Sequence, residues 1–234
     1  MSRLIVNAFY WFLDYLYVAK VEISSMFDRS HPEKYRTKNG KQVLLIPGIY
    51  ENWRFMQPIA KLLHSRGYDV HVIEKLGYNT GTVEQMALIA KEYIEDNHLS
   101  NVTIISHSKG GLIGKYLLNL IPDVDTLAGL IALNAPFSGS KYAYVLPFRS
   151  LRDFIPTSKT LTLLAIDRIS NARIVSIYGR FDPHIPGGSR LEGAKNIQLN
   201  TYGHFRIVND SHVHKAIIKN IKAPLYFSKN KSTI

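Results

Sequence analysis

The chain alternates two patterns of apolar residues from residue 34 onwards. Short, nearly continuous aliphatic runs are typical of strands buried on both faces, whereas apolar residues spaced three or four apart indicate helices. Strands are expected at residues 42–48, 68–74, 101–106, 127–133, 172–179 and 195–200, and helices over 53–64, 81–98 and 107–120. This alternation predicts one α/β domain over residues 34–222, with a mostly parallel central sheet and helices on both faces.

Turn-forming residues and a helix cap punctuate this pattern. The letters KNG at residues 38–40 are typical of a hairpin turn, and Thr82 is expected to cap the helix that follows it. Residues 137–170 break the alternation with Pro147, Pro156 and several aromatic residues. We expect this segment to form a small helical, cap-like excursion over the edge of the sheet.

Residues 1–30 are expected to contain an amphipathic helix. The apolar run from Leu4 to Val18 is shorter than the ~20 residues needed to span a bilayer, and it is interrupted by polar residues. On a helix, one face carries Asn7, Tyr10, Asp14 and Tyr17, and another carries Leu4, Ile5, Ala8, Phe9, Phe12 and Leu16. Such a helix either packs on its own domain, or lies in a membrane interface or shapes an apolar substrate entrance.

Composition narrows the functional class. The chain has no cysteine, which excludes disulfides, thiolate zinc sites and a cysteine nucleophile and favours a reducing, cytoplasmic location. Its net charge of +11 favours an anionic partner. Several lysines and no carboxylate follow Asp210, so residues 223–234 form a basic tail that either frays or makes a peripheral membrane contact. Zinc-finger spacing and RNA-binding aromatic motifs are absent, so no nucleic-acid partner is expected.

The stretch TIISHSKGGLIGKY at residues 103–116 is the strongest candidate for chemistry. A strand pattern runs into a helix pattern without a linker, and a turn this tight is typical of the nucleophile elbow, with Ser108 at the position of the nucleophile. Small residues are needed two positions before and after it, and these are Ser106 and Gly110. A phosphate-binding loop is excluded, because the spacing of the glycines is wrong and Tyr116 follows the lysine.

A serine nucleophile needs a histidine base and a carboxylate that orients it. In this kind of fold the acid and then the histidine follow the serine along the chain, from loops at the carboxyl ends of later strands. Asp182 comes just after a predicted strand, and His204 follows the last predicted strand and a glycine.

Other candidates for these two roles fit less well. Asp123 and Asp125 precede a strand, and Asp153 and Asp167 fall in the excursion. His107 is expected to point away from Ser108, and His184 is too close in sequence to Asp182. His212 and His214 are expected on the terminal helix.

The oxyanion of an acyl-transfer reaction needs backbone N–H donors. We expect these to be the N–H groups of Lys109, directly after the nucleophile, and of Ile49, in the loop after the first strand.

Five stretches of the sequence resemble those of the lipase and esterase branch of the α/β-hydrolase superfamily. They are LLIPGIYENW, ISHSKGGLIGKY, LNAPFSGSKYA, GRFDPHIP and GGSRLEGAKNIQLNTYGHFRIVND. Within them, SHSKGG and APFSGS resemble bacterial triacylglycerol-lipase-type proteins.

This resemblance covers roughly residues 40–215 and implies the α/β-hydrolase fold and acyl-ester hydrolysis through an acyl-enzyme. The expected function is therefore a serine carboxylic-ester hydrolase that acts on a small-molecule or lipid ester with an apolar acyl chain. It would use Ser108, His204 and Asp182, without cofactor or metal. Two alternatives stay open: an acyltransferase on the same scaffold, and a non-catalytic lipid- or membrane-binding protein.

Overall fold

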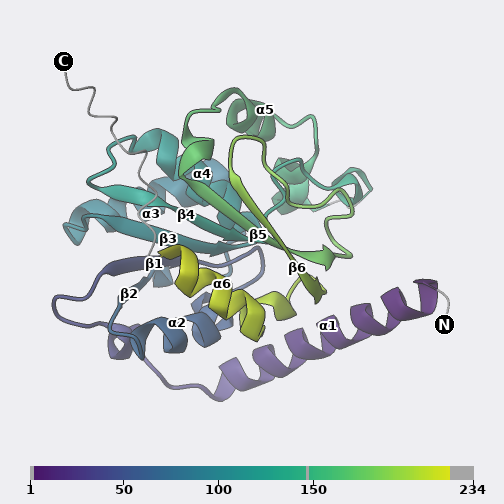
Figure 1. Ribbon diagram of the computed structural model, residues 1–234, viewed down its shortest axis with the longest axis horizontal. Helices are drawn as coiled ribbons and strands as arrows, with labels where there is room; N and C mark the ends of the chain where they lie inside the picture. Colours follow the sequence, from purple (N-terminus) through teal and green to yellow (C-terminus); the bar gives the residue numbers. More distant parts are fainter. Residues whose placement is uncertain (1–2, 146–147, 222–234) are drawn as a thin grey trace.

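The computed structural model describes residues 3–145 and 148–221 of the 234-residue chain. The basic tail predicted at residues 223–234 lies outside the described residues. Within them, a central sheet is sandwiched between two layers of helices, and the long helix α1 runs along one side of the molecule (Figure 1).

The sheet has six strands in the order β2-β1-β3-β4-β5-β6, and every neighbouring pair is parallel. The strands are β1 (Gln42–Ile46), β2 (Asp69–Val72), β3 (Val102–His107), β4 (Leu127–Leu133), β5 (Ile174–Phe181) and β6 (Lys195–Tyr202). The predicted α/β class and parallel sheet are confirmed. The prediction of a hairpin turn at residues 38–40 is wrong. The described residues before this turn contribute no strand to the sheet, and Pro32–Tyr35 form a 3-10 helix instead.

The helices are α1 (Arg3–Phe27), α2 (Gln57–His64), α3 (Val83–Asp96), α4 (Lys109–Leu120), α5 (Lys159–Ile166) and α6 (Ser211–Ile221). The helices α2 to α5 lie between successive strands, whereas α1 precedes β1 and α6 follows β6. Short 3-10 helices lie at Pro32–Tyr35, Trp53–Met56, Glu74–Leu76, Lys141–Tyr144, Arg149–Phe154, Ser170–Arg173 and Arg206–Asn209. Thr82 caps α3 as predicted, because its hydroxyl accepts the N–H of Gln85 while the Gln85 side chain accepts the N–H of Thr82.

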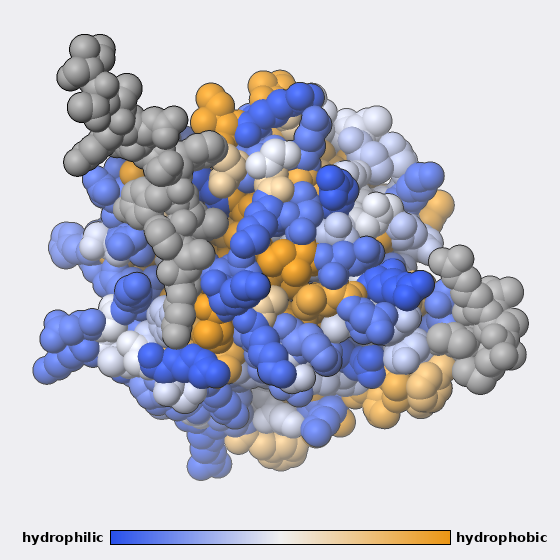
Figure 2. Space-filling model, in the orientation of Figure 1, coloured by the Kyte–Doolittle hydropathy of each residue, from blue (hydrophilic) through white to orange (hydrophobic). Residues whose placement is uncertain are grey.

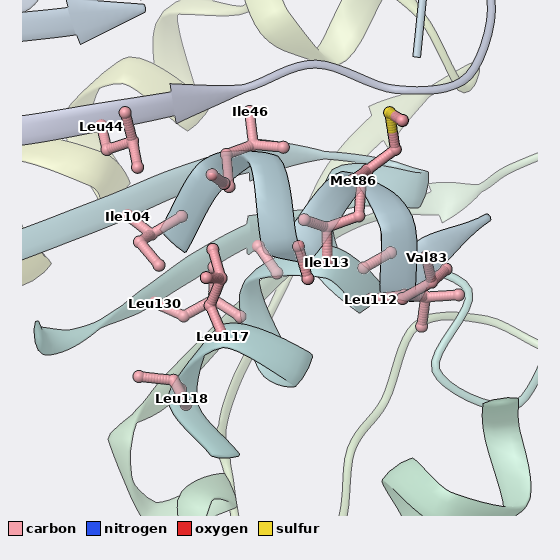
Figure 3. Packing of buried hydrophobic residues seen from close by; sticks show 14 of the residues in the cluster. Leu44, Ile46, Val83, Met86, Ile104, Leu112, Ile113, Leu117, Leu118 and Leu130 are labelled. Atoms are coloured by element: carbon pink, nitrogen blue, oxygen red, sulfur yellow. The ribbon is translucent and has the colours of Figure 1, made fainter. Parts of the chain in front are cut away.

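Successive side chains of each strand point to opposite faces of the sheet, so the core has two halves. On β1, Leu44 and Ile46 point towards α3 and α4, and Figure 3 shows them packed with Ile113 and Leu117. Val43 of the same strand faces α2 and α6. Because both faces are covered, the inner strands β1 and β4 are almost entirely apolar, whereas the edge strand β6 carries several polar residues.

The segment over residues 137–170 contains two 3-10 helices and α5. Its apolar residues Phe154, Leu161 and Leu164 are buried in the cluster that α3 and α4 form with the sheet. The segment therefore covers part of the core.

The helix α1 packs on the domain with its more polar side. Tyr17, Val18 and Val21 lie against the core half on the side of α2 and α6, and Asp14 is fully buried. Tyr10 stacks on Tyr202 of β6 at 4.4 Å between ring centroids. The opposite side of α1, which carries most of its large apolar residues, faces outward. Among the described helices, α1 included, none is long and apolar enough to cross a membrane.

Candidate active site

The turn between β3 and α4 places Ser108 in a strained backbone conformation. Its φ of +49° and ψ of −120° lie in a region that residues with a side chain seldom adopt. The turn is tight because α4 begins at the next residue and its first turn crosses β1. A Cβ at Gly110 would overlap the carbonyl oxygen of Ile46, and one at Gly111 would overlap the Cβ of Ala135. The two glycines therefore allow the close approach that holds Ser108 at the end of the sheet.

Ser108, His204 and Asp182 form one hydrogen-bonded chain. Nε2 of His204 lies 2.9 Å from Oγ of Ser108, and Nδ1 of His204 lies 2.7 Å from Oδ2 of Asp182. All three residues are buried or nearly so. Since a carboxylate accepts at Nδ1, the neutral imidazole carries its proton there and leaves Nε2 free to accept the proton of the serine. This is the geometry that activates a serine as a nucleophile.

The second oxygen of Asp182 is fixed by the backbone. Oδ1 accepts the N–H groups of His184 at 2.8 Å and Ile185 at 3.0 Å, in the turn that follows β5. Burial alone would raise the pKa of Asp182, but the charge of His204 and these hydrogen bonds hold it below its usual 3.8. The carboxylate is therefore ionised and points at the imidazole.

Burial and nearby charges also shift the pKa of His204. Burial disfavours its charged form, but Asp182, with Glu51 and Asp14 further away, outweighs burial and raises the pKa of His204 above 6.5. The neighbouring His184 shifts the other way. Burial and the charge of His204 lower the pKa of His184 to about 4, so it is a neutral side chain at the site, with its ring centroid 5.0 Å from that of His204.

The other candidate acids and bases lie elsewhere. Asp153 accepts the backbone N–H of Val83 and the hydroxyl of Thr160, and Asp123 closes its own turn by accepting from Thr126. His212 and His214 belong to α6. Among the described residues no group of three histidine, aspartate or glutamate side chains is arranged to hold a metal ion.

The loop after β1 is fixed at the peptide group between Pro47 and Gly48. The N–H of Gly48 donates to Glu51 at 2.7 Å, and the carbonyl of Pro47 accepts from the Asn79 side chain at 2.7 Å. The next residue, Ile49, lines the same cavity as Ser108.

The residue after the nucleophile has two parts with different surroundings. Lys109 begins α4, so its backbone N–H has no partner within the helix. Its ammonium group is buried and donates to the carbonyls of Asn79 at 2.8 Å and of Gly81. Burial lowers the pKa of Lys109 to about 8 although Asp153 opposes the shift. The Lys109 side chain thereby fixes Asn79, whose own side chain donates to the carbonyl of Pro47.

Asp14 of α1 is a site residue that sequence reasoning missed. Its carboxylate accepts the backbone N–H groups of His204 at 2.6 Å, Phe205 at 2.9 Å and Arg206 at 3.0 Å. The chain reaches this position through Gly203, whose φ of +105° suits glycine and where a Cβ would lie 2.6 Å from Oδ1 of Asp14. The N-terminal helix thus fixes the loop that carries His204.

His107 and Glu51 hold the other side of that loop. Nδ1 of His107 lies 2.8 and 2.9 Å from the two carboxylate oxygens of Glu51, and Nε2 lies 2.9 Å from the carbonyl oxygen of His204. Because a carbonyl oxygen only accepts, Nε2 of His107 donates to the carbonyl of His204. The side chain of Asn134 also donates to the carbonyls of Gly203 and His204, at 3.1 and 3.2 Å.

No local signal in the sequence marks these residues. His107 was expected to point away from Ser108, and its ring does lie among Glu51, Phe55 and the backbone of His204. Glu51 links it to the loop of Gly48. Two loops that flank the serine, one after β1 and one after β6, are therefore joined by one buried acid and one buried histidine.

A mainly apolar cavity of about 370 Å³ opens beside Ser108 and His204. Its walls come from α1, from the loop after β1 and from the segment over residues 137–170, and they include Tyr15, Val18, Ile49, Tyr142, Phe148 and Phe154. The hydroxyl of Tyr15 lies 3.3 Å from Nε2 of His184. A larger cavity of about 1000 Å³, which shares Tyr142 and His184, lies between the N-terminal half of α1 and the end of β5.

No protein-family profile and no curated protein matches the sequence. Solved structures do match. An α/β-hydrolase enzyme from a metagenome of lagoon sediments is 17% identical, with a TM-score of 0.59 over 80% of this chain and 92% of that one. The mature lipase BlEst2 of Bacillus licheniformis is 15% identical, with a TM-score of 0.60 over 82% and 96%. The monoacylglycerol lipase of Paleococcus ferrophilus is 16% identical, with a TM-score of 0.55 over 78% and 95%. Together with the parallel sheet and the strand-to-helix turn at Ser108, these similarities show that the chain has the α/β-hydrolase fold.

Proposed function

We propose that the protein is a serine hydrolase that cleaves carboxylic esters through an acyl-enzyme. The observation that carries this proposal is the hydrogen-bonded chain from Ser108 through His204 to Asp182. A serine held in a strained turn and bonded to an imidazole, which is itself bonded to an ionised carboxylate, is the arrangement that nucleophilic acyl transfer requires. Several proteins of the same fold are described as lipases.

In the proposed reaction, Oγ of Ser108 attacks the ester carbonyl while Nε2 of His204 takes the serine proton. Asp182 keeps the imidazole in the right tautomer and stabilises the imidazolium that forms. The backbone N–H groups of Ile49 and Lys109 would donate to the oxyanion of the tetrahedral intermediate. His204 then protonates the leaving alkoxide, which departs as the alcohol and leaves the acyl group on Ser108.

Water completes the cycle. His204, again neutral, takes a proton from a water molecule that attacks the acyl-enzyme, and then returns that proton to Oγ of Ser108. The carboxylic acid leaves and the enzyme regains its starting state. The proposed reaction needs no cofactor, because His204 accepts and then returns each proton that moves.

The cavity favours an ester with an apolar acyl chain. Its walls beside the serine are mainly aliphatic and aromatic, including Ile49, Leu151 and Phe154, and a volume of about 370 Å³ is in the range of ligand pockets. Each methylene group that the cavity removes from water adds about 0.8 kcal/mol of binding energy. We therefore propose a substrate whose acyl group is longer than acetyl.

A fluorophosphonate probe tests the proposal, because it labels only an activated serine. Labelling should occur on the native protein and disappear in Ser108→Ala. A series of p-nitrophenyl esters from acetate to palmitate then measures hydrolysis and its dependence on acyl length. An unlabelled, correctly folded native protein would reject the proposal and favour a non-catalytic role for the fold.

A further inference from the structure

The outward face of α1 carries exposed apolar side chains from Phe9 to Phe27. We define this outer face as Phe9, Phe12, Tyr15, Leu16, Ile23, Met26 and Phe27, which are all exposed; Phe12 is 64% exposed, Ile23 59% and Met26 80%. One of the apolar patches in Figure 2 lies at the lower right, in the place that α1 occupies in Figure 1. Amphipathic helices on soluble domains normally turn this side inward, so α1 has the opposite polarity. An exposed apolar surface of this kind marks a binding surface.

We infer that the outer face of α1 binds the surface of an anionic lipid bilayer. A helix that lies in the bilayer interface has aromatic and aliphatic residues on one side and basic residues at its margin. Here Lys20 is exposed between Leu16 and Ile23, and Arg29 is exposed just after the helix. The two carboxylates of α1 are withdrawn, because Asp14 is buried and Glu22 is only partly exposed.

Basic residues of the domain lie next to the same helix. Arg180 and Arg190 are exposed, and they line the larger cavity together with Ala8 and Trp11 of α1. A negatively charged surface that contacted α1 would meet these guanidinium groups as well. The net charge of +11 acts in the same direction over longer distances.

The position of the apolar cavity favours a lipid bilayer over a second copy of the chain. Tyr15 of α1 lines the cavity from one side, and Tyr142 and Phe148 line it from the other. These three residues are also exposed, so apolar side chains form the rim. A bilayer against this rim could pass an acyl chain directly into the cavity, whereas a second chain would cover the opening. This last argument rests on the proposed function; the outer face itself does not.

Vesicle flotation tests the inference. The native protein should float with vesicles of equal parts phosphatidylcholine and phosphatidylglycerol, and less with phosphatidylcholine alone. The double variant Phe12→Glu, Ile23→Glu should bind at least about tenfold more weakly, since each change removes a large apolar side chain from the interface. The control is Leu88→Glu, which changes a leucine of α3 that is 51% exposed and lies away from the outer face; this variant should bind like the native protein.

Tryptophan fluorescence provides a second, local readout. The chain has two tryptophans; Trp53 is buried, whereas Trp11 is about half exposed next to the outer face. Anionic vesicles should shift the emission to shorter wavelength in the native protein, and Trp11→Phe should abolish this shift. Circular dichroism and fluorophosphonate labelling of the double variant check that it is folded and that its site is intact.

The outcomes separate the two proposals. Ser108→Ala should bind vesicles like the native protein, so vesicle binding without ester hydrolysis would reject the proposed function and retain the lipid surface. Equal binding by the native protein and the double variant, or no binding to either vesicle, would overturn the inference. A dimer in sedimentation equilibrium that the double variant dissociates, without vesicle binding, would assign the outer face to a second copy and likewise overturn it.

Discussion

The carboxylate of Asp14 accepts the backbone N–H of His204 at 2.6 Å, although 190 positions separate the two residues in the chain. With the N–H groups of Phe205 and Arg206, it receives three hydrogen bonds in a buried place. A hydrogen bond to a charged group contributes about 1.5–3 kcal/mol to stability. The N-terminal helix is therefore part of the candidate site and not an appendage to it.

Replacing Asp14 by asparagine should reduce kcat more than it raises KM, because the change displaces the loop of His204 without touching the acyl cavity's aliphatic walls. A pH profile distinguishes this positioning role from mere destabilisation. Asp14 is one of the charges that raise the pKa of His204, so in Asp14→Asn the acid limb of kcat/KM should move to lower pH. A loss of activity with an unchanged acid limb would assign Asp14 a purely structural role.

Replacing Ser108 by alanine should leave the fold intact and lower ester hydrolysis by ~10³-fold or more, because the remaining catalysis would come from binding and the oxyanion donors alone. Single-turnover hydrolysis of a p-nitrophenyl ester measures the effect, and circular dichroism checks the fold. Activity within a few-fold of the native level would place the nucleophile elsewhere.

The choice of base is tested by comparing three histidines. His204→Ala should be as damaging as Ser108→Ala, since Nε2 of His204 is the group bonded to the serine. His212→Ala and His214→Ala change residues of α6 and should be mild. If one of these two variants lost most of the activity and His204→Ala did not, the proposed assignment would be reversed.

The proposed hydrolysis by the native protein should be lost on the acid side of neutrality. His204 must be neutral to accept the serine proton, and its raised pKa means that the protonated, inactive form persists to higher pH than for a free histidine. The acid limb of kcat/KM should therefore have its midpoint above pH 6.5. A limb centred near pH 4 would point instead to His184, whose pKa is lowered to about 4.

Gly110→Ala should destabilise the protein by about 1–3 kcal/mol, because the added methyl group has to displace the backbone of β1 at Ile46. The control is Gly187→Ala, where an added Cβ meets no atom within 4 Å. Urea unfolding of the two variants gives the comparison. Equal stability of both would show that the strand-to-helix turn relaxes easily.

The sequence could predict the parts of this structure that depend on local pattern. The strands and the elbow follow from runs of aliphatic residues and from small residues at fixed spacing, and chain order indicated Asp182 and His204. The turn at residues 38–40 was misassigned because an asparagine-glycine pair suits several kinds of turn. The roles of Asp14, Glu51 and His107 were beyond prediction, since each depends on a contact with residues dozens or hundreds of positions away.

The amphipathic pattern of α1 likewise identified two faces but not which of them points inward. Burial of apolar surface alone would have favoured the opposite orientation, with the apolar outer face packed against the domain. The three hydrogen bonds to Asp14 and the stacking of Tyr10 on Tyr202 favour the observed orientation. These partners lie at residues 202–206, so the sequence of the first thirty residues could not indicate them.

The contact between Asp14 and His204 also sets an order of events during synthesis. The helix α1 leaves the ribosome before the loop that it holds, because His204 is made 190 residues after Asp14, a delay of ~10–40 s at ordinary translation rates. During that time the nascent chain carries α1 without the loop that Asp14 holds and, once residue 108 has been made, a serine without its base. Hydrolysis of the proposed kind would therefore begin only after Asp14 and the loop of His204 have met.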